Sequence, residues 1–181
     1  MENVVRGGAN GWSRWRMAMW GVAAFLLLLP LVAMQFTSEV NWEPGDFLVM
    51  GIMLTVACGT CEMAARISGN GAYRAAVGIA VVISFLLVWI NLAVGIIGTE
   101  DNVLNLMYGG VIAVAVVGSL VAGFRAAGMA KAMFAAAAAQ LLVAVVAQIE
   151  GHFTWGLTLF FTLLWLVSAG LFRKASEAVA V

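Results

Sequence analysis

Charged residues are scarce in this chain. They make up 10% of its 181 residues, while 64% are hydrophobic, whereas a soluble domain has about 25% charged and 45–50% apolar residues. This balance leaves no room for a separate soluble domain. The net charge is zero, and the basic residues are too scattered to form a groove that follows phosphates, which argues against nucleic-acid binding. Two cysteines are too few for a disulfide framework.

The sequence is instead dominated by long apolar segments. A helix needs about 20 apolar residues to cross the hydrocarbon core of a bilayer. Six segments meet this requirement: 17–36, 47–65, 75–97, 107–123, 127–149 and 153–172. The loops between them are short, so consecutive helices must be antiparallel neighbours. We therefore predict an all-α fold, a polytopic transmembrane bundle of about six helices that forms a single domain over residues 1–181.

The basic residues predict the orientation, because Lys and Arg accumulate on the cytoplasmic side of a membrane. All nine fall on the same side of a six-span chain: Arg6, Arg14, Arg16, Arg66, Arg74, Arg125, Lys131, Arg173 and Lys174. The three loops on the opposite side contain none of them. This segregation predicts that both the N-terminus and the C-terminus are cytoplasmic.

The opposite, outer side is acidic. Its three loops carry six carboxylates and the only histidine: Glu39, Glu43, Asp46, Glu100, Asp101, Glu150 and His152. Oxygen-rich clusters suit hard cations, and a histidine among carboxylates suits zinc or iron. The competing interpretation is local: Asp46 and Asn102 or Asn105 are placed to cap helices, and Gly151 resembles a helix stop. A bound cation is the one cofactor that we consider, and no cofactor is otherwise expected.

A pair of thiols lies in the second predicted span. Cys58 and Cys61 have the spacing that places two sulfur atoms on one face of a helix, where they could bind a soft metal or form a disulfide. They lie in mid-helix, far from a helix N-terminus that would activate a thiol. Small residues are also favoured where membrane helices touch, so packing is the favoured interpretation.

Small or polar residues recur every four positions in the last two predicted spans. One row is Gly128, Ala132, Ala136, Gln140, Ala144 and Gln148, and the other is Thr154, Thr158 and Thr162. Asn91 lies near the outer end of the third span. These side chains should face the bundle interior, where they either line a route for a small polar solute or form hydrogen bonds between helices.

Two stretches resemble known sequences. They are the run from Asn91 through Gly95, Gly98 and Asn102 to Tyr108, and the loop from Phe36 to Phe47. Both are similar to stretches of short, multi-spanning bacterial inner-membrane proteins of unassigned function, with no named family among them. The resemblance covers about two-thirds of the chain, from the end of the first span through the fifth. It implies a bacterial inner-membrane location and no activity.

Three functions remain open at this point. The polar rows narrowly favour a small-solute or ion transporter or channel with an acidic outer vestibule. The alternative is a non-catalytic accessory or structural subunit of a membrane complex, which needs only helices that pack. A membrane redox or metal-dependent enzyme is least favoured, because no recognised catalytic spacing is present. The expected partners are the lipid bilayer and either further copies of this chain or a larger membrane complex.

Overall fold

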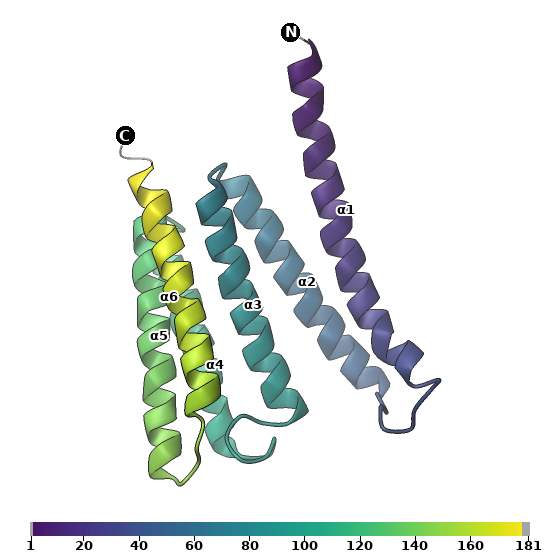
Figure 1. Ribbon diagram of the computed structural model, residues 1–181, viewed down its shortest axis with the longest axis vertical. Helices are drawn as coiled ribbons and strands as arrows, with labels where there is room; N and C mark the ends of the chain where they lie inside the picture. The colour runs from purple at the N-terminus through teal and green to yellow at the C-terminus, as the bar shows by residue number, and fades with distance from the viewer. Residues whose placement is uncertain (1, 179–181) are drawn as a thin grey trace. The chain divides into compact units, whose positions relative to one another are not determined.

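The computed structural model describes residues 2–178, and the side chains of residues 14–178. Over that range its secondary structure is entirely helical (Figure 1): α1 (Glu2–Ala33), α2 (Pro44–Ile67), α3 (Gly71–Ala93), η1 (Val103–Asn105), α4 (Leu106–Val121), α5 (Ala126–Ile149) and α6 (Trp155–Glu177). The described chain contains six helices long and apolar enough to cross a membrane. The predicted fold class is thereby confirmed, and the protein is a multi-pass membrane protein.

Of the predicted spans, the third extends furthest beyond its helix. The third span was predicted to continue to residue 97, but α3 ends at Ala93. Gly95 then adopts a φ of 69°, and a side chain there would meet the backbone of Thr99 at 2.5 Å. The chain therefore turns sharply after α3. The prediction extended the span because residues 94–97 are mostly apolar. Ile97 is indeed fully buried, but it is buried from a loop and not from a helix.

The chain divides into two compact units, one reaching to Met63 and the other beginning at Ala64. The first unit contains α1 and most of α2. An apolar groove of about 500 Å³ lies between these two helices, with Trp20 and Leu27 on one wall and Phe47 and Leu54 on the other. Pro30 lies in the last turn of α1, which continues through it to Ala33. The predicted single domain over residues 1–181 stays a prediction.

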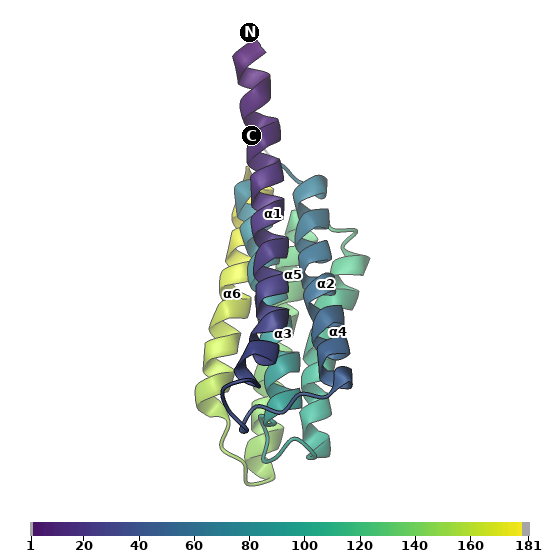
Figure 2. The same ribbon diagram turned by 90° about the vertical axis from the view of Figure 1, so that its right-hand side faces the viewer.

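The second unit is a bundle of α3, α4, α5 and α6. In it α5 packs against both α4 and α6, and α3 packs mainly against α6, with the four helix axes roughly aligned (Figures 1 and 2). We call the end with the 94–105 and 150–154 loops the loop end, and the end with the 122–125 turn and the last turn of α6 the C-terminal end. The bundle core includes the fully buried side chains of Phe161, Trp165 and Phe172.

The contact between α4 and α5 depends on small residues. A side chain carbon at Gly118 would lie 2.7 Å from the Cβ of Ala132, and one at Gly128 would lie 2.6 Å from the Cβ of Ala122. Both distances are shorter than real carbon atoms tolerate, so the two backbones approach as closely as glycine permits. The predicted small-residue row on α5 is confirmed as a packing surface over Gly128, Ala132 and Ala136.

Candidate functional site

Three threonines on α6 point into the bundle. Thr158 and Thr162 lie one turn apart on the helix, and Thr154 occupies the N-cap position before it. All three are buried, and none of their hydroxyl groups has a hydrogen-bond partner within the protein. Thr55 and Thr60 on α2 behave differently, because each donates to the carbonyl four residues earlier. The hydroxyls of Thr158 and Thr162 form no such bond with their own helix.

Tyr108 brings α4 to this row. Its side chain is 1% exposed, and its hydroxyl lies beside the hydroxyls of Thr154 and Thr158. The three hydroxyls are close enough to interact, but none of them forms a well-aligned hydrogen bond in the described structure. Because an unpaired polar group costs several kcal/mol in a membrane interior, these hydroxyls can be stabilised by pairing with one another or with a polar guest.

Gln140 and Trp165 extend the polar surface toward the middle of the bundle. Gln140 is 1% exposed and its Oε1 accepts no hydrogen bond, while the Nε1 of the fully buried Trp165 donates none. Gln140 lies nine residues before the end of α5, and Trp165 ten residues after the start of α6. In antiparallel helices that rise about 1.5 Å per residue, these positions have similar depths.

Asn91 contributes from α3. Its Nδ2 donates to the carbonyl of Leu87 at 2.6 Å, which leaves its Oδ1 buried without a partner. We call the set with these unpartnered buried atoms the polar core, and it draws on all four helices. Its members are Asn91, Tyr108, Gln140, Thr154, Thr158, Thr162 and Trp165.

Most members of the polar core, but not all, were predicted from the sequence. The predicted interior positions of Gln140 and of the three threonines are confirmed by their burial. Tyr108 and Trp165 were missed, because aromatic residues count as apolar in a search for spans. Gln148 was predicted to face the interior and is instead exposed, where its Oε1 accepts from the Nε1 of Trp155 at 3.1 Å. It lies one residue before the end of α5, beside the first residue of α6.

The C-terminal end of the bundle is closed by groups that have partners. The Tyr73 hydroxyl donates to the carbonyl of Phe124 at 2.9 Å, and its ring meets that of Phe172 edge-on at 5.2 Å. The Ser168 hydroxyl donates to the carbonyl of Ala76 at 2.9 Å, which ties α6 to α3. The unpartnered atoms are thus concentrated in the middle and toward the loop end, while the C-terminal end is sealed.

The loop end is covered by an ordered segment, residues 94–105. The Oδ1 of the buried Asn105 accepts from the backbone N–H groups of Ile96 and Ile97, at 3.1 and 2.8 Å. Its Nδ2 donates to the carbonyls of Ile97 and Thr99, at 3.4 and 2.8 Å. One side chain therefore holds the whole turn, with Ile97 pressed into the bundle. We call this arrangement the Asn105 clasp.

The acidic residues of the predicted outer face do not form a metal site in the part of the chain that the structure describes. No group of three or more His, Cys, Asp or Glu side chains there could hold a metal ion. Glu39, Glu43, Glu100, Asp101 and Glu150 are exposed. Asp46 accepts from the backbone N–H of Glu43 at 2.8 Å, which confirms it as a cap of α2. The ring of His152 packs against Gly98.

Asn102 and Gly151 also have the local roles that their sequence positions indicate. The Oδ1 of Asn102 accepts from the backbone N–H of Leu104 at 3.0 Å and caps η1. Gly151 has a φ of 84°, and the N–H of His152 bonds back to the carbonyl of Ala147 at the end of α5. Left-handed glycine with such a bond is a common helix ending. These loop residues thus shape the backbone.

The thiol pair and an acidic residue lie together on α2. Cys58 is buried, Cys61 is partly buried, and both are free thiols. Next to them, Glu62 forms an ion pair with Arg16 of α1, with 3.0 Å between Oε1 and the guanidinium. Trp20 donates to the other carboxylate oxygen at 3.5 Å. The glutamate side chain is only 11% exposed, so this pair joins the two helices of the first unit.

No protein-family model, curated protein or solved structure matches the chain. The function is accordingly inferred from the site itself. Among the groups described above, the polar core is the one with buried polar atoms that form no hydrogen bonds. Its amide and hydroxyl oxygens can accept hydrogen bonds, and its hydroxyl and indole groups can donate them. What it can do chemically is bind or pass a molecule that supplies the missing partners.

Proposed function

We propose that this protein is a membrane transporter or channel that passes a small polar solute through the α3–α6 bundle. The observation that carries the proposal is the polar core, in which seven side chains from four helices bury polar atoms without protein partners. A protein in lipid must satisfy its polar groups internally. When a polar guest is present, these atoms gain the hydrogen bonds that the bundle does not supply.

The two ends of the bundle fit the proposal as gates. The Asn105 clasp covers the loop end, and the contact of Tyr73 with Phe172 and Phe124 closes the C-terminal end. Passage then requires each end to open in turn, as in transporters that alternate access to a site near the midplane. The backbone at the clasp is irregular, which membrane proteins tolerate where it lines a cavity or is buried in protein.

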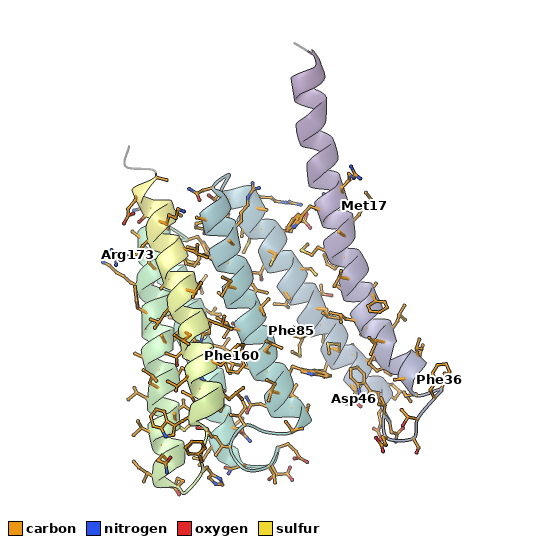
Figure 3. All side chains as sticks on the ribbon, viewed as in Figure 1. Met17, Phe36, Asp46, Phe85, Phe160 and Arg173 are labelled. Atoms are coloured by element: carbon orange, nitrogen blue, oxygen red, sulfur yellow. The ribbon has the colours of Figure 1, made fainter. Side chains whose placement is uncertain are left out.

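The proposal includes a bacterial inner-membrane location with both termini in the cytoplasm. The support is the sorting of basic residues: Arg74, Arg125, Arg173 and Lys174 all lie at the C-terminal end of the bundle, and Arg173 points outward there (Figure 3). Such residues stay on the cytoplasmic side. Reporter fusions to the C-terminus and to the 94–105 loop should give opposite signals, and the same signal from both would contradict the topology.

Two glutamines on α5 provide a matched test of the proposal. Gln140 belongs to the polar core, whereas Gln148 is exposed on the same helix. The protein is reconstituted in vesicles, and osmotic shrinkage and solute re-entry are followed by stopped-flow light scattering. Gln140→Leu should abolish the flux of water and small solutes that the protein adds, because it removes an acceptor from the route. Gln148→Leu should leave that flux intact.

The competing function is a non-catalytic subunit of a membrane complex. It predicts no flux above that of empty vesicles from the folded wild-type protein, and changed thermal stability in Gln140→Leu as its main effect. Intact protein that adds no flux but copurifies with one partner chain in fixed ratio would therefore overturn the transport proposal. Equal loss of flux in both glutamine variants would also count against the polar core as the route.

A further inference from the structure

The polar core is free of charge. Every buried polar side chain in the second unit is an amide, a hydroxyl or an indole. In the described chain, the buried acidic or basic side chain is that of Glu62, which belongs to the first unit. The charged residues of α3–α6 are exposed toward the C-terminal end: Arg74, Lys131, Arg173, Lys174 and Glu177. No fixed charge therefore faces the route within the bundle.

A charge-free route discriminates against ions. Moving an ion into the interior of a bilayer costs several kcal/mol even with partial hydration, and transporters offset that cost with a residue of opposite charge or with rings of carbonyl groups. The polar core provides neither. A neutral polar molecule needs only hydrogen bonds, and the unpartnered atoms of this bundle are suited to form them.

The unpartnered atoms also specify the kind of hydrogen bond. Asn91 Oδ1 and Gln140 Oε1 only accept, the hydroxyls of Tyr108 and of the threonines accept and donate, and Trp165 Nε1 only donates. Acceptor sites thus outnumber sites that only donate. A guest that fits them carries several O–H or N–H groups and at least one oxygen, as small polyols and urea-type amides do.

We infer that the solute of the α3–α6 bundle is a small uncharged molecule with several O–H or N–H donors, and that inorganic and organic ions are excluded. This inference rests on the proposed function, whose site it specifies. It reverses one element of the sequence prediction, since the acidic outer loops had kept an ion among the candidates. The polar core, and not the loops, decides which molecules pass.

Urea and guanidinium test this inference, because the two are planar, nearly equal in size and rich in N–H groups, yet differ by one charge. Entry of each into protein-containing vesicles is measured by light scattering, with potassium and valinomycin present to balance the charge. Urea should enter several-fold faster than into empty vesicles, and guanidinium at the rate of empty vesicles. Acetamide and acetate form a second pair with the same expected order.

Variants connect the flux to the polar core. Tyr108→Phe and Thr158→Val each remove a single hydroxyl at nearly constant volume, and should lower urea entry several-fold without lowering the unfolding temperature. Thr55→Val is the control, since that exposed hydroxyl already bonds to its own helix. Equal effects of all three variants would overturn the assignment to the core.

The outcomes separate this inference from the function on which it rests. Faster entry of guanidinium or acetate, lost in Tyr108→Phe, would leave the route in place and overturn the choice of a neutral solute. Flux of water alone would likewise keep the route and overturn the solute class. No added flux of any probe, from protein that unfolds cooperatively, would remove the proposed function itself.

Discussion

Replacing Gly118 by alanine should force α4 and α5 apart. The new methyl carbon would lie 2.7 Å from the Cβ of Ala132 and 3.3 Å from its Cα, whereas carbon atoms in contact are about 3.5–4.0 Å apart. The helices must therefore separate by roughly 1 Å at this point. Overpacking of this kind costs about 1–3 kcal/mol. The contact is between backbones and short side chains, so no flexible side chain can move to absorb the change.

The assay is the equilibrium unfolding of purified protein in mixed micelles, compared between Gly118→Ala and Gly110→Ala. Both substitutions lie on α4, but a methyl group at Gly110 meets nothing within 4 Å. Gly110→Ala should be neutral or stabilise the helix by about 0.5–1 kcal/mol, because glycine is the more costly residue within a helix. A Gly118→Ala protein as stable as its Gly110→Ala counterpart would refute the close approach of α4 and α5.

Three further changes test other contacts. Asn105→Ala removes all four hydrogen bonds of the clasp and should destabilise the 94–105 loop by about 2–5 kcal/mol. The loss should be measurable as faster amide hydrogen exchange in that loop, and unchanged exchange would contradict the clasp. Arg16→Leu breaks the ion pair and should lower the thermal stability, because it leaves the charge of the buried Glu62 without this partner. A second change in the same protein, Glu62→Leu, should restore part of that stability by removing the buried charge. A further loss of stability in the double variant would argue against the pair. Ser168→Ala should cost about 0.6 kcal/mol, the mean for hydrogen bonds between membrane helices, and unfolding in micelles that is indistinguishable from wild type would show that the tie to α3 is weak.

Much of the fold was predictable because span length and apolarity directly reflect the thickness of the bilayer. The end of α3 was not predictable, since Ile96 and Ile97 look like helix residues. In the structure the side chain of Asn105, eight to nine residues later, accepts hydrogen bonds from their N–H groups in a turn. The four-residue repeat correctly placed Gln140 but not Gln148, because a helix has 3.6 residues per turn and positions four apart therefore drift around its surface.

The same limit applies to the polar core. Its threonines and amides stand out in an apolar sequence, and they were found for that reason. The Tyr108 hydroxyl and the Trp165 indole N–H were hidden within residues whose rings are apolar. A search that asks where the polar tip of every aromatic residue finds a partner would have indicated both, since such tips usually have one when buried.

The tie between Ser168 and Ala76 has a consequence for how the protein is made. Its two residues are separated by 92 positions, and α3 packs mainly against α6, which is synthesised after α4 and α5. Neighbouring pairs such as α4 and α5 can associate soon after both are inserted, but the side of α3 that packs against α6 stays uncovered until α6 is inserted. A nascent chain stopped before α6 would thus expose an unfinished bundle, and membrane quality control would have a way to recognise it.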